Sequence, residues 1–196
     1  MSVTEVGVLR SSEKAYAGLH VTILGILLFV SAVLNFALAS RLHTLTVSRS
    51  APSLNKQMES ISAKDMNGVP VNLDLRAGKP FTVVYIYRPS CGWCAKNLQN
   101  VKQLARQIQS KQQGAIIGVS LENDDLREYV VKSELGFPSY SDLPFEFQRE
   151  YQLGATPETL VVENGKVVRD WRGAWTDETH GDVEKFFGVR LPGLVQ

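Results

Sequence analysis

The sequence contains few cysteines and histidines, and it has no excess of charge of either sign. Its 196 residues include two cysteines and three histidines, and 21 Lys and Arg nearly balance 20 Asp and Glu, for a net charge of +1. The missing basic excess argues against binding to nucleic acid through phosphate neutralisation. A structural zinc ion needs four ligands, which two cysteines and scattered histidines supply poorly. The sequence therefore predicts no nucleic-acid partner, no metal site and no cofactor.

Charged residues are also absent from one long segment, residues 19–39 (LHVTILGILLFVSAVLNFALA). A helix of this length, at about 1.5 Å per residue, spans roughly the 30 Å core of a bilayer. A signal peptide is the alternative, because Ala37 and Ala39 form a small-x-small site around Leu38. The apolar stretch is nevertheless longer than the usual signal core of about 7–15 residues. We therefore expect a transmembrane anchor at 19–39, preceded by an N-terminal flank at 1–18.

The rest of the chain divides by composition into a linker, a domain and a tail. Residues 40–60 are rich in Ser and show no sustained apolar periodicity, which predicts a linker. Residues 61–190 carry strand-like and helix-like patterns and are expected to form one globular domain, followed by a short tail at 191–196. A hydrophobic content of 44% is sufficient for a packed core in that domain.

Strand and helix patterns alternate along the predicted domain. The continuous β-rich run at 81–87 predicts a central strand that is buried on both faces. An apolar stripe at helical spacing follows and predicts a helix that ends at Gly114. The stripe consists of Leu98, Val101, Leu104, Ala105 and Ile108. Asn164-Gly165 between two β-branched runs predicts a type I′ hairpin. Further elements are expected as an edge hairpin at 68–73, a strand at 115–119, and helices at 124–133, 145–151 and 177–187. Parallel units followed by an antiparallel hairpin predict an α/β sandwich.

The two cysteines, Cys91 and Cys94, lie in the stretch RPSCGWCAKN between the predicted central strand and the helix. This places Cys91 at a helix N-terminus, where free N–H groups and the helix dipole favour a thiolate. Cys94 lies one turn further in, shielded and able to attack the sulfur of Cys91. Arg88 either adds positive potential or is a solvated charge at the end of the strand. A static disulfide over so short a loop stabilises little, so the spacing favours a redox dithiol. Copper binding with His180 is conceivable, but a lone His in a polar stretch is more often a surface residue.

A Thr-Pro pair, Thr156-Pro157, directly precedes the predicted strand that begins near Leu160. From the residues alone, a plain turn proline is the favoured interpretation. A cis proline at this position would instead present the backbone of Thr156 beside the thiols.

The combination of a strand, CGWC, a helix, and Thr-Pro followed by an Asn-Gly hairpin resembles the thioredoxin fold. With the extra segment at 121–151 and the anchor, the chain resembles the membrane-anchored TlpA/ResA-like thiol-disulfide oxidoreductases on the outer face of bacterial membranes. The resemblance implies a three-layer sandwich with a mixed central sheet, a nucleophilic Cys91, a resolving Cys94 and a cis Pro157. It also matches Gly173 to the glycine that members carry after the last strand.

Two positions depart from the pattern of these relatives. Thioredoxins place a buried Asp six residues before the first cysteine, where this chain has Tyr85, and TlpA/ResA-like members often place a Glu where it has Asn97. Neither side chain is a carboxylate base at neutral pH. Glu158, next to Pro157, is a hypothetical acid/base substitute; the alternative is a surface residue at the start of a strand. Trp93 either offers an apolar face to a client or packs on the domain surface.

The sequence thus predicts a thiol-disulfide oxidoreductase that is tethered to the cytoplasmic membrane by a single span and exchanges electrons with protein disulfides. Positive residues on the two flanks of the span nearly tie, so the extracytoplasmic or periplasmic side is expected from the disulfide chemistry. With two cysteines there is no internal relay, so a separate redox partner must exchange electrons with the dithiol. The alternatives are a binding module or metal chaperone that uses the dithiol as a ligand, and a thiol peroxidase. The usual peroxidase signature is absent, because Pro89 stands only two residues before Cys91.

Overall fold

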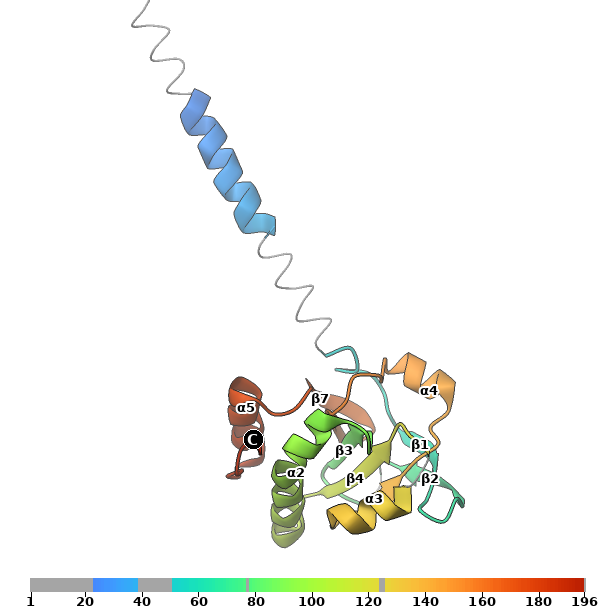
Figure 1. The fold of residues 1–196 in the computed structure, drawn as a ribbon. Helices are drawn as coiled ribbons and strands as arrows, with labels where there is room; N and C mark the ends of the chain where they lie inside the picture. The colour runs from blue at the N-terminus through green and yellow to red at the C-terminus, as the bar shows by residue number, and fades with distance from the viewer. Residues whose placement is uncertain (1–22, 39–50, 77, 124–125, 196) are drawn as a thin grey trace, which may run out of the picture. The chain divides into compact units, whose positions relative to one another are not determined.

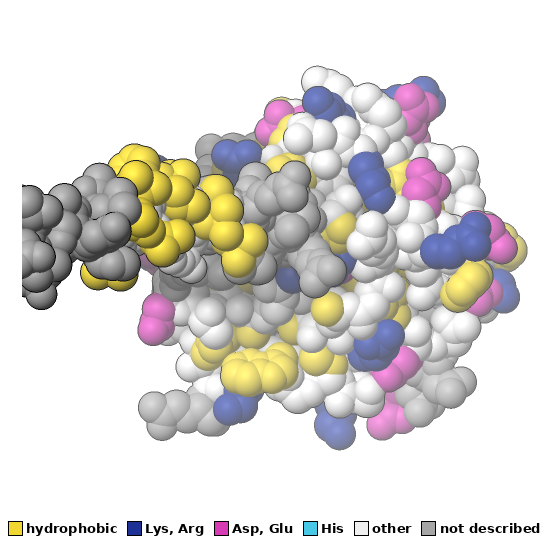
Figure 2. All heavy atoms as spheres, turned by 90° about the horizontal axis from the view of Figure 1, so that it is seen from above, with side chains coloured by type: hydrophobic (Ala, Val, Ile, Leu, Met, Phe, Trp, Pro, Cys, Tyr) yellow, Lys and Arg dark blue, Asp and Glu magenta, His cyan; other side chains and the backbone are white. Residues whose placement is uncertain are grey.

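The computed structural model describes residues 23–38, 51–76, 78–123 and 126–195, and the chain separates into two units, residues 1–48 and 49–196 (Figure 1). In the first unit, residues 23–38 form a helix whose large apolar side chains are all exposed; Figure 2 shows hydrophobic side chains over its surface. Within the described ranges, no helix is both long and apolar enough to cross a membrane. The predicted anchor at 19–39 extends beyond the described helix at both ends.

The second unit is built on a mixed sheet of five strands; the sequence resemblance implies a mixed sheet, but the short strand at 139–140 was not predicted. In spatial order the strands are β5 (Ser139–Tyr140), β4 (Ala115–Ser120), β3 (Thr82–Tyr87), β6 (Glu158–Glu163) and β7 (Lys166–Arg172). β3, β4 and β5 pair in parallel, whereas β6 pairs antiparallel with both β3 and β7. The predicted central strand is therefore β3, which is hydrogen-bonded on both sides.

The two faces of this sheet are covered by different layers. One face packs against α2 (Gly92–Lys111), α3 (Leu126–Ser133) and α5 (Asp177–Phe187), three helices that contribute side chains to a single core cluster. The other face packs against α4 (Phe145–Glu150) and a separate two-stranded hairpin of β1 (Ser60–Lys64) and β2 (Pro70–Asp74). The predicted sandwich is therefore confirmed in its layers, and the hairpin expected near 68–73 forms a sheet of its own (Figure 1).

Local turn chemistry sets two of the connections. Asn164 and Gly165 both have positive φ (49° and 76°), as a type I′ turn requires, and they join β6 to β7 as predicted. α2 ends earlier than predicted, at Lys111, with Gln112 in the left-handed conformation. Gly114 has a different reason to be glycine: a Cβ there would lie 2.5 Å from the ring of Phe81.

The folded unit also begins earlier than the predicted domain boundary. The predicted linker covers 40–60, but Ser53 and Met58 are fully buried. The N–H of Met58 donates to the carbonyl of Gly165 at 2.6 Å, and the Ser53 hydroxyl donates to the carbonyl of Tyr151 at 2.7 Å. Residues 51–60 therefore pack onto the second unit, and residues 40–50 lie outside the described ranges.

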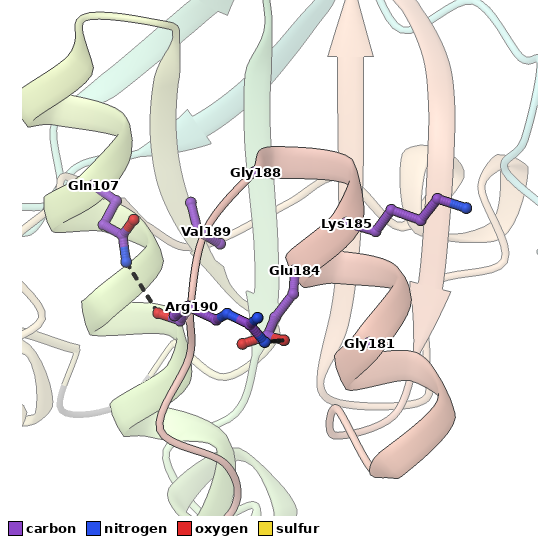
Figure 3. Close-up of a pocket in the computed structure, with 7 residues that line it drawn as sticks. All are labelled: Gln107, Gly181, Glu184, Lys185, Gly188, Val189 and Arg190. Carbon is purple, nitrogen blue, oxygen red and sulfur yellow. Dashed lines mark hydrogen bonds and ion pairs between the residues drawn. The ribbon is translucent and has the colours of Figure 1, made fainter.

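The predicted tail likewise lies against the domain, along α2. Gln107 donates to the carbonyl of Arg190 at 3.0 Å, as Figure 3 shows. Further along, the N–H of Gly193 donates to Asn100 at 2.8 Å, and that of Val195 donates to the carbonyl of Lys96 at 3.1 Å. The C-terminal segment thus runs antiparallel to α2, toward the end of the helix that carries the cysteines.

Candidate active site

Cys91 and Cys94 lie at the start of α2, directly after the central strand β3. Cys91 is the N-cap residue, in an extended conformation, and its sulfur accepts a hydrogen bond from the N–H of Cys94 at 3.1 Å. Both are free thiols; Cys91 is half-buried, whereas Cys94 is 1% exposed. The sequence predicts this difference, and the helix geometry explains it, because the cap residue stands outside the first turn.

The Thr156-Pro157 pair lies beside the thiols although it is far away in the sequence. The peptide bond between the two residues is cis, as the family resemblance implies and against the plain turn proline. The thiol of Cys91 donates to the carbonyl oxygen of Thr156 at 3.3 Å. On the other side, the N–H of Gly173 donates to the carbonyl of Pro157 at 2.7 Å, so the glycine after β7 supports the same loop.

The surroundings make the two thiols unequal in acidity. Burial alone would raise the pKa of Cys91, but hydrogen bonds with the side chains of Cys94 and Thr156 and with the N–H groups of Cys94 and Trp93 outweigh it and hold this pKa below its usual value. Burial raises the pKa of Cys94 to about 12, with a further contribution from Cys91. Of the two thiols, Cys91 is therefore the more acidic and the more accessible.

Three hydrogen bonds that the sequence did not predict hold the loops around the thiols. Arg88, at the end of β3, donates from Nη1 to the carbonyl of Gly154 at 3.0 Å and so connects the cysteine loop to the Thr-Pro loop. Glu122 accepts from both the N–H (3.1 Å) and the hydroxyl of Ser90, the residue before Cys91. No spacing in the sequence marks Glu122, because it approaches Ser90 only through the pairing of β3 with β4.

Trp93, between the cysteines, is 56% exposed, and the ammonium of Lys96 lies 5.5 Å from the centre of its ring. The indole is therefore held at the surface by a cation–π contact on one face. It remains accessible next to Cys91, which is compatible with a client contact, one of the two roles considered for it. Whether it makes that contact stays a prediction.

Glu158 does not lie where the acid/base hypothesis requires. It is the first residue of β6 and fully buried, so it is not the surface residue of the alternative interpretation either. Side chains alternate along a strand, and Glu158 shares the face of Leu160, which belongs to the core cluster opposite to that of Cys94. Its partners are on β7: Arg172 Nε lies 3.4 Å from Glu158 Oε1, and the charge of Asp170 acts on it. The sheet separates this carboxyl group from the thiols.

Tyr85 and Asn97, the two departures from the family pattern, lie on the same side of the sheet as Cys94. Tyr85 is 2% exposed and belongs to the core cluster that contains Cys94, and Asn97 is fully buried on α2. Burial raises the pKa of Tyr85, and the charge of Cys94 adds to this effect. The phenol is therefore a neutral donor beside the buried thiol.

No other feature of the described residues competes with this site for the predicted chemistry. Among these residues, no group of three or more His, Cys, Asp or Glu is arranged to hold a metal ion, so His180 does not join the cysteines in one. A pocket between α2 and α5 holds none of the predicted site residues (Figure 3). Its lining consists of Gln107, Gly181, Glu184, Lys185, Gly188, Val189 and Arg190.

Two thiols of unequal acidity at a helix start serve thiol-disulfide exchange, and in this fold they define a thioredoxin-like thiol-disulfide oxidoreductase. Residues 54–171 match the AhpC/TSA family, and the chain belongs to that family. A thioredoxin-like protein of Haemophilus influenzae is 25% identical over 120 residues, which cover 59% of this chain and 68% of that protein.

Solved structures with the same fold include two from Bacteroides. A thiol:disulfide interchange protein from Bacteroides sp. is 23% identical, with a TM-score of 0.54 over 69% of this chain and 90% of that one. The thioredoxin domain of a thiol-disulfide oxidoreductase from Bacteroides vulgatus is 22% identical, with a TM-score of 0.54 over 68% and 97%. These similarities show that the chain has the thioredoxin fold.

Proposed function

We propose that this protein is a membrane-tethered oxidoreductase that exchanges electrons with disulfides of client proteins through Cys91 and Cys94. The observation that supports it best is the unequal thiol pair, with one accessible sulfur of lowered pKa and one buried sulfur a single turn away. The Cys91 thiolate attacks a client disulfide, forms a mixed disulfide and releases one client thiolate. Cys94 then attacks Cys91, so the enzyme becomes a disulfide and the client gains two electrons and two protons. Oxidised enzyme and a reduced client run the same steps in reverse.

The surroundings of Cys91 support a polypeptide as the client. The carbonyl of Thr156 lies 3.3 Å from the Cys91 sulfur, and the exposed ring of Trp93 adjoins the same sulfur in the sequence. We expect an extended client segment to lie between the indole and the Thr156 backbone, because an aromatic face and a stretch of backbone beside the reactive sulfur suit such a segment.

The exchange is tested by trapping. In the Cys94→Ala variant the mixed disulfide cannot be resolved, so client proteins should accumulate as adducts that a reductant releases. The Cys91→Ala variant is the matched control and should trap none. A binding module would retain its partner without a thiol bond and would not turn over insulin in the presence of a chemical reductant. Lack of any adduct together with lack of insulin reduction by the native protein would contradict the proposed function.

The tether and its orientation are proposed from the uncharged segment at 19–39 and from the exposed apolar helix at 23–38. The disulfide chemistry supports a domain outside the cytoplasmic membrane, in the periplasm of a two-membrane cell. Because the chain has only two cysteines, its redox partner must be a separate protein. Deletion of residues 19–39 should move the protein from the membrane fraction to the soluble fraction. In intact cells, a membrane-impermeant maleimide should label Cys91; labelling only after lysis would contradict this orientation.

A further inference from the structure

Two polar side chains behind the buried thiol have hydrogen-bond donors that the described residues leave unused. The Tyr85 hydroxyl and the Asn97 side-chain nitrogen are buried without a hydrogen-bond partner within the described part of the chain. Buried polar groups are nearly always paired, so each exception needs an explanation.

The orientation of the Asn97 amide is determined by its neighbours. Its oxygen accepts two hydrogen bonds, from Asn100 Nδ2 at 3.0 Å and from the N–H of Trp175 at 3.3 Å. The Asn100 oxygen in turn accepts from the N–H of Gly193 in the C-terminal segment. An amide whose oxygen is used twice must turn its NH₂ group the other way. Contacts from α2, the loop before α5 and the C-terminal segment thus leave the donor side of Asn97 free.

The free donors lie on the side of Cys94. Asn97 follows Cys94 by three residues, a spacing that makes them neighbours on one face of α2. Tyr85 packs in the same core cluster as Cys94; burial and the charge of Cys94 raise the pKa of its phenol, and the nearby Asn97 side chain lowers it. The remaining titratable groups whose charge acts on Cys94 are Cys91 on α2, Tyr87 on β3 and Tyr129 on α3.

We propose that Tyr85 and Asn97 donate hydrogen bonds to the Cys94 thiolate as it forms, and so stabilise its charge instead of removing its proton. The proposal rests on the thiol-disulfide exchange proposed above. In the resolving step the Cys94 sulfur bonds to the Cys91 sulfur, and the bond between Cys91 and the client sulfur breaks. The client leaves as a thiolate and takes up a proton equivalent to the one that Cys94 lost. No carboxylate has to change its charge in this step.

A single-turnover reaction tests the role of Tyr85 and Asn97. The full chain in its reduced form is mixed with an aromatic disulfide probe, 5,5′-dithiobis(2-nitrobenzoate). The first thionitrobenzoate released reports attack by Cys91, and the second reports resolution by Cys94. A hydrogen bond to a charged group is strong enough that its loss should slow the second release by about 10- to 100-fold. Tyr85→Phe and Asn97→Ala should each slow the second release by this factor and should shift the pH profile of that release to higher pH. The first release should be unchanged.

Tyr87→Phe is the matched control. The Tyr87 hydroxyl is also buried without a partner among the described residues, and its ring stacks on Tyr85 at 5.7 Å, but its polar neighbour is Ser139 instead of Asn97. Its second release should equal that of the native protein. If Asn97→Ala does not fold, Tyr85→Phe still carries the test, because it keeps the ring.

Three distinguishable results would contradict either the proposed role of Tyr85 and Asn97 or the proposed function. A normal second release in Tyr85→Phe, with a normal first release, overturns the role of these donors and leaves the exchange intact. An equal slowing in Tyr87→Phe also overturns it, since the effect would then come from core packing. No release at all from the native protein overturns the proposed function itself.

Discussion

Cys91 and Cys94 are three residues apart and chemically different, because one caps the helix and the other is inside its first turn. The cap position gives Cys91 hydrogen bonds that favour its thiolate, and burial denies the same charge to Cys94. The pair therefore has a built-in order of reaction. We therefore expect exchange with an external disulfide to begin at Cys91 and to end at Cys94.

This order predicts the alkylation pattern of the reduced protein. Iodoacetamide at pH 7 should modify Cys91 and leave Cys94 unmodified, because only the thiolate reacts. The rate at Cys91 should titrate with a midpoint below that of an ordinary thiol, since its pKa is lowered. Tandem mass spectrometry separates the two sites, and the unfolded protein, in which both react, is the control. Equal rates at both cysteines in the folded protein would contradict this assignment.

The buried carboxyl group of Glu158 should make the stability of the protein depend on pH, independently of the thiols. Burial raises its pKa from 4.5 to about 8, and the charge of Asp170 adds to this, while Arg172 opposes it. The pKa of Asp170 is raised too, again by burial. A carboxyl group whose pKa is higher in the folded state binds more protons there, so its stabilisation is complete below the unfolded value and is lost as the pH rises through the folded value. The window is therefore about pH 4.5 to 8.

In urea unfolding between pH 5 and 9, the native protein should lose stability relative to Glu158→Gln as the pH rises. Glutamine keeps the shape of the side chain but has no proton to lose, so this part of the pH dependence disappears. Thiol exchange at pH 7 should be unchanged in the variant, because the sheet separates Glu158 from Cys94. Parallel stability curves for the two proteins would contradict the buried, protonated carboxyl group.

At the scale of elements, the turn from α2 into β4 depends on a close approach. A Cβ at Gly114 would lie 2.5 Å from the Phe81 ring, which itself packs on Phe187 with 5.6 Å between ring centres. Gly114→Ala should therefore lower the free energy of unfolding by about 1–3 kcal/mol, as overpacking does. Chemical denaturation of the native protein and the variant measures this difference in the free energy of unfolding.

Gly181→Ala is the control for that substitution. Gly181 lies inside α5, and a Cβ there would meet nothing within 4 Å. Alanine should stabilise the helix by about 0.5–1 kcal/mol because it is the better helix former. A loss of stability at Gly181, or none at Gly114, would contradict the packing described for these elements.

At the scale of the whole molecule, the folded unit includes the segment before β1. Met58 is 1% exposed and joins the core cluster of the β1–β2 face, whereas Leu54, four residues earlier, is 40% exposed. Met58→Ala should lower the free energy of unfolding by about 2–5 kcal/mol, the usual result of emptying a core position. Leu54→Ala should change it by less than about 0.5 kcal/mol. Similar small effects for both would mean that the domain begins where the sequence suggested, near residue 61.

Short-range patterns account for the parts of the fold that the sequence predicted. The run at 81–87 is short and rich in β-branched and aromatic residues, which favours a strand, and the stripe behind the cysteines has a helical period; β3 and α2 follow them. Asn164-Gly165 specifies its own turn. The N-terminal boundary of the domain was less predictable. Residues 51–60 bind β7 mainly through backbone hydrogen bonds, which produce no periodic pattern of side chains in the sequence.

By itself, the sequence determined the chemistry: two thiols three residues apart at a helix start, after a buried strand, with a Thr-Pro pair downstream. Only the tertiary structure decided what surrounds them. The pairing of β6 with β3 brings the Thr156 carbonyl to Cys91, and the alternation of side chains turns Glu158 to the far face of the sheet. The donor side of Asn97 is free because Asn100 and Trp175 occupy its oxygen. The physical reason is that register, face and amide orientation depend on contacts between segments far apart in the chain, which local patterns do not encode.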